Sequence, residues 1–155
     1  MAYLLLLEKK GQPHGDNMKK ILIVDDERLL LDSLARYLSI ENINVKTVEN
    51  GSDALKEVSS SFYPLCFLDV NLPDINGLNV MKKMKALSPQ TKVVIMTAAY
   101  LTDEMKKEIE GSADYFIAKP FDLIHIKTIA DVVLMNKNAH PVPPLIKGSA
   151  LESGT

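Results

Sequence analysis

The sequence predicts an α/β fold in which a parallel sheet of five strands is covered by five helices on its two faces. Short apolar runs alternate along the chain with segments whose apolar residues recur every three or four positions. The second pattern is typical of a helix with one buried face. The apolar runs are nearly continuous, which indicates strands buried on both sides. Because parallel strands need helical crossovers, the alternation favours a doubly wound sheet.

The predicted strands are the apolar runs themselves, in chain order. They cover residues 20–25, 44–50, 64–70, 92–98 and 114–120. The helices between them are placed by their apolar spacing and by their end signals. Three of them have buried faces formed by Leu31, Leu34, Ala35 and Leu38, by Val80, Met81, Met84 and Leu87, and by Ile126, Ile129, Ala130 and Val133.

The other two helices carry signals at their ends. Residues 51–61 form a helix that packs Leu55 and Val58, and Ser52 is its expected N-cap. The helix over residues 102–111 has Thr102 as N-cap and Gly111 as its stop.

Length and composition narrow the class of protein. A chain of 155 residues suits one domain, and its net charge of −2, with acids and bases interleaved, argues against direct nucleic-acid binding. The single cysteine, Cys66, lies in an apolar run, so we expect a buried thiol and a cytoplasmic protein without disulfides. The apolar run near the start is too short to span a membrane.

The chain divides into three parts. Residues 1–17 end in a Gly/Pro/polar stretch and are predicted to be an N-terminal extension or linker. Residues 18–135 hold the folded domain. Residues 136–155, rich in proline and small residues, are expected to be a flexible tail or an expression remnant.

Polar side chains follow four of the predicted strands at the point where each strand ends. Asp25 and Asp26 follow the first strand, Asp69 the third, Thr97 the fourth and Lys119 the fifth. Ligands of open parallel sheets bind beyond the carboxyl ends of the strands. In the flavodoxin-like strand order 2-1-3-4-5, these four strands are contiguous, so we expect one shared site.

The residue types at this edge indicate the chemistry. Adjacent carboxylates repel one another unless a hard cation intervenes, and Mg²⁺ takes oxygen ligands; Mn²⁺ is an expected substitute. Lys119 supplies a second positive charge, and the Thr97 hydroxyl is a donor for phosphate oxygen. One carboxylate then becomes a candidate nucleophile that forms an aspartyl phosphate.

With these residues in place, the sequence resembles the receiver domain of two-component response regulators, of the chemotaxis-regulator kind. The matching motifs are Asp25-Asp26 in ILIVDDE, Asp69 with Pro73 and Gly77 in LDVNLPDINGL, Thr97 in VVIMTAA, and Lys119-Pro120 in DYFIAKPF. The match runs from about Lys19 to about Met135, and five separated positions agree in order and strand context.

The resemblance implies a role for each residue of the site. Asp69 is the expected phosphoryl acceptor. Its phosphoryl group is expected to come from the phosphohistidine of a sensor histidine kinase or phosphotransfer protein. Asp26 and Asp69 bind Mg²⁺ directly with the backbone carbonyl of Asn71, and Asp25 acts through water. Lys119 pairs with the incoming phosphoryl group.

The resemblance also implies a switch. The Thr97 hydroxyl turns toward the new phosphoryl group, and Phe116 occupies the place of the switch aromatic residue. The bond from Lys119 to Pro120 is expected to be cis. The surface of the fourth helix, fifth strand and fifth helix then changes shape for an effector protein, a missing C-terminal output domain or a homodimer. No membrane partner is expected.

Other interpretations compete with this one. The protein is predicted to be a switch that catalyses its own phosphotransfer and slow dephosphorylation, not an enzyme acting on other substrates. An aspartate-nucleophile phosphohydrolase is the first alternative, although Asn71 stands where such enzymes have an acid. A degenerate receiver that only binds partners is the second. Lys82, Lys83 and Lys85 are expected to lie on a solvated helix face.

Overall fold

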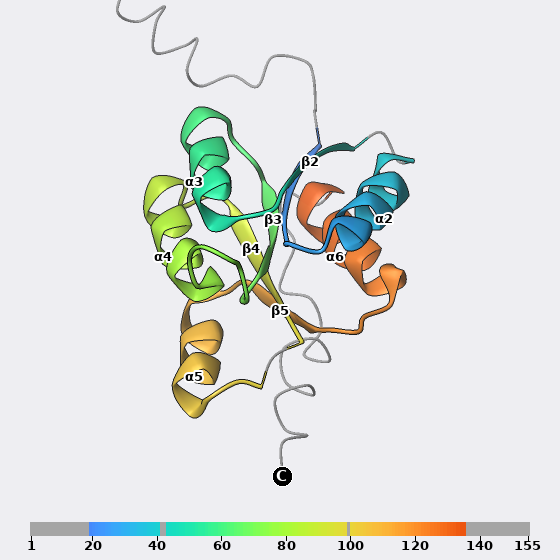
Figure 1. Cartoon of the computed structure of the whole chain (residues 1–155). Coiled ribbons are helices and arrows are strands. Elements are labelled where there is room, and N and C mark those ends of the chain that lie inside the picture. Colours follow the sequence, from blue (N-terminus) through green and yellow to red (C-terminus); the bar gives the residue numbers. More distant parts are fainter. Residues whose placement is uncertain (1–18, 41–42, 99, 136–155) are drawn as a thin grey trace, which may run out of the picture.

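The computed structural model describes residues 19–40, 43–98 and 100–135. The predicted extension over residues 1–17 and the predicted tail over residues 136–155 lie outside the described residues. Strands and helices alternate as expected (Figure 1). In chain order they are β1 (Lys20–Val24), α2 (Arg28–Ser39), β2 (Asn44–Val48), α3 (Gly51–Ser60), β3 (Leu65–Asp69), α4 (Gly77–Leu87), β4 (Lys92–Thr97), α5 (Asp103–Ser112), β5 (Tyr115–Ala118) and α6 (Leu123–Met135).

The strands form one sheet in which every pair is parallel. Their order is β2-β1-β3-β4-β5, which confirms the predicted flavodoxin-like arrangement. Helices α2 and α6 lie on one side of the sheet, and α3, α4 and α5 lie on the other (Figure 1). Each crossover helix therefore covers a face that would otherwise expose apolar strand residues to water.

Two separate apolar cores lie on the two faces of the sheet. Successive strand residues point to opposite faces, so Val93 and Ile95 join the core under α3, α4 and α5, whereas Val94 and Met96 join the core under α2 and α6. All five residues of β3 are buried. Fully burying one such aliphatic side chain contributes about 1.5–3 kcal/mol. The same alternation sets the face that each residue at a strand end can reach.

The helix ends confirm one capping prediction and correct two others. Thr102 caps α5, because its side chain accepts a hydrogen bond from the Met105 backbone N–H at 3.2 Å. The Ser52 cap was wrong: Ser52 lies inside α3, which begins at Gly51, and the side chain of Asn50 accepts the Asp53 backbone N–H at 2.8 Å. Gly111 does not stop α5. It stays within the helix, which ends after Ser112.

Helix α4 differs from the prediction near its C-terminus. Leu87, expected in the buried stripe, is 55% exposed, and it is the last residue of the helix. Lys85, expected to be solvated, instead binds the Asp114 carboxylate and donates to the Thr91 carbonyl at 2.8 Å. The lysine therefore makes the contacts between this end of the helix and the segments before β4 and β5.

Among the described residues, the helices are too short or too polar for any of them to cross a lipid bilayer.

Candidate functional site

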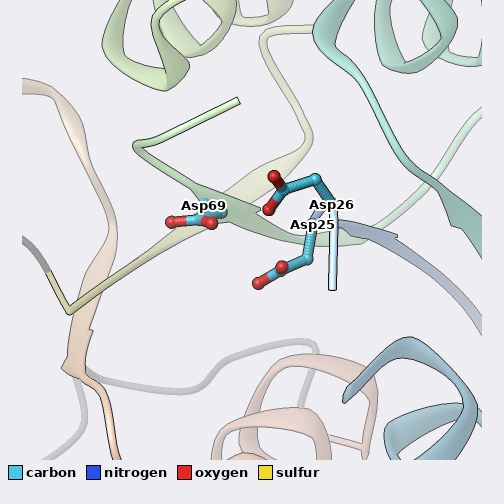
Figure 2. A group of neighbouring side chains, drawn as sticks. All are labelled: Asp25, Asp26 and Asp69. Carbon is cyan, nitrogen blue, oxygen red and sulfur yellow. The ribbon is translucent and has the colours of Figure 1, made fainter. Parts of the chain in front are cut away.

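Three carboxylates meet at the carboxyl-terminal edge of the sheet. Asp25, Asp26 and Asp69 each offer one oxygen, and these oxygens lie within 4.8 Å of one another. Figure 2 shows the three side chains gathered where β1 and β3 end. Asp25 and Asp69 are buried, whereas Asp26 is exposed. The three acids therefore lie together at the strand ends, as the sequence predicted.

The register of two neighbouring strands brings the acids together. Val24 of β1 pairs with Leu68 of β3, so the residues that follow them, Asp25 and Asp69, lie side by side at the sheet edge. The Asp25 backbone N–H donates to the Val48 carbonyl at 3.2 Å, which holds the end of β1 against β2. Its carboxylate accepts the backbone N–H of Glu27 at 2.9 Å. This contact orders the turn into α2.

Lys119 enters the cluster from β5, past the ends of two intervening strands. Its backbone N–H donates to the Thr97 carbonyl at 2.9 Å, and its bond to Pro120 is cis, as expected. Its Nζ lies 2.5 Å from Asp25 Oδ2 and 3.4 Å from Asp69 Oδ2. The side chain is 11% exposed, so the ammonium group points into the site and not to solvent.

The surroundings make Asp69 an unusual carboxyl group. Burial raises its pKa above the ordinary aspartate value, and the negative charge of Asp25 raises it further. The charge and hydrogen bond of Lys119 and the Asn71 backbone N–H, at 3.3 Å, act in the opposite direction but do not outweigh these effects. The described residues therefore do not fully stabilise the negative charge of ionised Asp69.

Lys119 is held in its charged form. Burial works against the charge of its ammonium group, but the hydrogen bond to Asp25 and the charges of Asp25, Asp69 and Glu27 outweigh burial and raise its pKa. Glu27 Oε1 lies 3.5 Å from Nζ on a side chain that is 65% exposed. The sequence placed Glu27 in the acidic run but gave it no role.

The charges at this edge do not balance among the described residues. One lysine faces the carboxylates of Asp25, Asp26, Asp69 and Glu27. Oxygen ligands at this spacing, with an excess of negative charge, suit a hard divalent cation such as Mg²⁺. The residues present therefore fit the metal that the sequence predicted.

Thr97 and Phe116 lie toward the face of the sheet that α3, α4 and α5 cover. Thr97 is the last residue of β4 and is 3% exposed; two residues after Ile95, it shares the Ile95 side by strand alternation. Phe116 is 5% exposed and belongs to the same core, together with Leu101 and Ile109. Both candidate switch residues thus adjoin the side that α5 covers.

The start of α4 packs directly against the backbone of Asp69. A Cβ atom added to Gly77 would lie 2.0 Å from the Asp69 carbonyl oxygen and 2.7 Å from Val70 Cα. The Gly77 N–H also donates to the Val70 carbonyl at 2.7 Å. No side chain fits here, which gives a steric reason for the glycine of the motif. Asn71, between these residues, is exposed, and Ala99 lies outside the described residues.

A doubly wound sheet with acids and a lysine at its carboxyl edge places this chain among the α/β proteins whose ligand site lies beyond the strand ends. Residues 21–131 match the family model of the response regulator receiver domain. The chain belongs to this family, and it is a signalling module of two-component systems rather than a conventional enzyme.

Individual relatives agree with this assignment. The chain is 35% identical over 150 residues to the response regulator ArlR of Staphylococcus aureus (strain Mu50), a match that covers 87% of this chain and 67% of that protein. A CheY-like receiver domain protein from Methanospirillum hungatei JF-1 is similar in structure, with a TM-score of 0.67 and 31% identity over 74% of this chain and 94% of that one.

A third similar protein was crystallised with ligands. It is the response regulator TrrA of Thermotoga maritima, in complex with Mg²⁺ and BeF, with a TM-score of 0.64 and 31% identity. The match covers 74% of this chain and 97% of that one.

Proposed function

We propose that this protein is a Mg²⁺-dependent phospho-receiver in which Asp69 accepts a phosphoryl group from the phosphohistidine of a sensor histidine kinase or phosphotransfer protein. One observation carries the proposal. Carboxylate oxygens of Asp69, Asp25 and Asp26 lie within 4.8 Å of one another, and Asp69 Oδ2 lies 3.4 Å from Lys119 Nζ. The Mg²⁺–BeF complex of the similar Thermotoga regulator supports the same chemistry.

The transfer step is a displacement at phosphorus. A carboxylate oxygen of Asp69 forms a P–O bond while the P–N bond of the phosphohistidine breaks, and the released imidazole nitrogen takes a proton from solvent. The product is an aspartyl phosphate. The ionised carboxylate is the nucleophile, and the ammonium group of Lys119, 3.4 Å from Asp69 Oδ2, favours that ionised form.

Mg²⁺, when bound, offsets negative charge on the phosphoryl oxygens. Asp26 and Asp69 are the proposed direct ligands, with the Asn71 backbone carbonyl, and Asp25 acts through water; Mn²⁺ is the proposed substitute. Lys119 bonds to Asp25 in this structure. The phosphoryl group is the new partner to which Lys119 turns, because that group adds charge beside it.

The switch uses the face that Thr97 and Phe116 share. The Thr97 hydroxyl donates to the new phosphoryl group, and the space it leaves lets Phe116 turn inward, which reshapes the surface of α5, β5 and α6. Changing a population from 1:99 to 99:1 takes about 5.5 kcal/mol. A few charge-assisted hydrogen bonds, each about 1.5–3 kcal/mol, are sufficient.

The reshaped surface is the proposed output. It is suited to an effector protein, an output domain or a second copy of the chain, in a cytoplasmic setting. Neither the described geometry nor the relatives favour the phosphohydrolase alternative.

Incubation with Mg²⁺ and acetyl phosphate tests the proposal. Wild-type protein should gain the mass of one phosphoryl group, Asp69→Asn should gain none, and the exposed control Asp32→Asn should behave as wild type. Loss of the gain on adding EDTA should confirm the metal requirement. A wild-type protein that stays unmodified, or Asp69→Asn that is modified elsewhere, contradicts the assignment. Repeated turnover of unrelated phosphate esters would favour the phosphohydrolase.

A further inference from the structure

The segment between β3 and α4 leads directly from the proposed acceptor, and both of its ends are fastened. We name residues 70–76 the acceptor loop. The Val70 N–H donates to the Met96 carbonyl at 3.1 Å, and the Gly77 N–H donates to the Val70 carbonyl at 2.7 Å. These bonds hold the base of the loop against the sheet but do not reach its tip.

The tip of the acceptor loop is fastened by Asp74 to a helix that begins more than 20 residues earlier. Its Oδ1 accepts the Gly51 backbone N–H at 2.8 Å, and its Oδ2 accepts the Ser52 backbone N–H at 2.9 Å. Oδ1 also accepts the Ile75 N–H at 2.8 Å. One carboxylate thus joins the first turn of α3 to the loop that carries Asn71, a proposed metal ligand.

This contact is packed as well as hydrogen-bonded. A Cβ atom on Gly51 would lie 2.6 Å from Val80 Cγ2 and 3.3 Å from Ile75 Cβ, so α3 approaches the loop and α4 as closely as a glycine allows. The slight burial of Asp74 raises its pKa, but the backbone hydrogen bonds from Gly51, Ser52 and Ile75 outweigh it and leave the pKa below its ordinary value. Asp74 is therefore charged at neutral pH.

Helix α3 has a cap of its own and does not depend on Asp74 alone. The side chain of Asn50 accepts the Asp53 N–H at 2.8 Å, in the ordinary manner of an N-cap residue. Asp74, from the acceptor loop, accepts the N–H groups of Gly51 and Ser52, which precede that of Asp53. The arrangement separates two roles: Asn50 caps the helix, and Asp74 joins the helix to the loop.

We propose that Asp74 is a positioning residue, which fixes the acceptor loop to α3 and thereby holds Asn71 and Asp69 in the arrangement that binds Mg²⁺. The inference rests on the proposed function of the site. Groups that orient metal ligands without touching the metal typically change metal affinity by about 10–100-fold when they are removed. Without Asp74, the loop tip must be ordered anew each time the ion binds.

Three variants of the full chain separate positioning from helix capping. Asp74→Ala removes both acceptor oxygens. Asp74→Asn keeps one oxygen for Gly51 and Ile75 but presents an amide N–H₂ to Ser52. Asn50→Ala, the matched control, removes a cap from the same helix turn and leaves the loop contact intact.

Two measurements give the result. Hydrogen exchange of the amides of residues 70–77 in metal-free protein reports loop order, and an NMR titration with MgCl₂ reports the dissociation constant. Asp74→Ala should speed exchange across the loop and raise the dissociation constant about 10-fold. Asp74→Asn should fall between Asp74→Ala and wild type. Asn50→Ala should lower the denaturation midpoint but leave the Mg²⁺ affinity unchanged.

The outcomes distinguish this inference from the function on which it rests. If Asp74→Ala keeps the wild-type loop exchange and Mg²⁺ affinity, Asp74 does not position the site, although Asp69 can still be the acceptor. If Asn50→Ala weakens Mg²⁺ binding as much as Asp74→Ala does, the effect is general fraying of α3 and the inference is overturned. A wild-type protein that binds no Mg²⁺ overturns both.

Discussion

The two ends of the parallel sheet each hold a lysine–aspartate pair, but the balance of positive and negative charge around the pair is opposite at the two ends. At the amino-terminal end, Asp114 binds Lys85, lies 3.5 Å from Lys92 and accepts the Val93 backbone N–H at 2.8 Å. At the carboxyl-terminal end, Lys119 is shared among three carboxylates, with that of Asp26 close by. One end has cations in excess of its acid, and the other has acids in excess of its cation.

This difference separates a structural end from a functional end. The contacts around Asp114 tie α4, β4 and β5 together, and Thr91 adds a hydroxyl bond to the Tyr63 carbonyl at 2.8 Å. Around Asp69 the carboxylates repel one another, which burial makes worse. Repulsion of this kind lowers stability without a ligand, and a bound cation can relieve it.

The largest effect on stability is expected at the structural end. Asp114→Ala should lower the free energy of unfolding by about 2–3 kcal/mol, because it removes the charge-assisted hydrogen bond to Lys85 and leaves the Val93 N–H without that acceptor. Urea denaturation measures the change. The same variant should be phosphorylated on Asp69 as readily as wild type. A loss of phosphorylation in a folded Asp114→Ala protein would show that the two ends are coupled.

Metal addition should act at the other end. Mg²⁺ at ten times its dissociation constant should raise the free energy of unfolding by about 1.4 kcal/mol, since the ion binds only the folded cluster. Removing it with EDTA should reverse the gain. Asp114→Ala should show the same increment as wild type, and Asp69→Asn a smaller one. An equal increment in Asp69→Asn would mean that the ion binds away from the acidic cluster.

A smaller effect is expected from pH. The folded-state pKa of Asp69 is raised, so in metal-free protein the folded state holds its proton more tightly than the unfolded state. The contribution of Asp69 to stability should therefore fall as pH rises from about 4, the ordinary pKa, through the folded-state value. Denaturation midpoints across this window should fall less in Asp69→Asn than in wild type.

The pKa of Lys119 is also raised, but this affects the alkaline range. Its contribution is complete below the unfolded-state pKa and is lost as pH rises through the folded-state value. The two residues therefore act in separate pH windows. If the denaturation midpoints of Asp69→Asn and wild type changed equally with pH in the acidic window, the repulsion assigned to Asp69 would be absent.

The smallest effect should come from Lys92. Its ammonium group lies 3.5 Å from Asp114 on a side chain that is 54% exposed. Lys92→Ala should lower stability by about 0.2–1 kcal/mol, the range of exposed ion pairs. High salt should reduce the difference further. A loss as large as that of Asp114→Ala would mean that the excess of cations, and not Lys85 alone, holds this end together.

Much of the candidate site follows from strand positions in the sequence. Asp25, Asp26, Asp69 and Lys119 could be placed together because the carboxyl ends of parallel strands share one edge. The Ser52 cap could not be placed correctly, because Asn50 two residues earlier satisfies the same helix end. The half-buried contacts of Lys85 were missed because Asp114 lies 29 residues away.

By itself, the sequence determined the sheet, its helices and the residues at its carboxyl edge, because the periods of strands and helices and the order of polar residues are local properties. Only the tertiary structure decided that Lys119 pairs most closely with Asp25, that Glu27 joins it, and that Asp74 fastens the acceptor loop to α3. These contacts depend on how far side chains reach between segments distant in the chain. No repeating pattern in the sequence indicates which of these distant side chains meet.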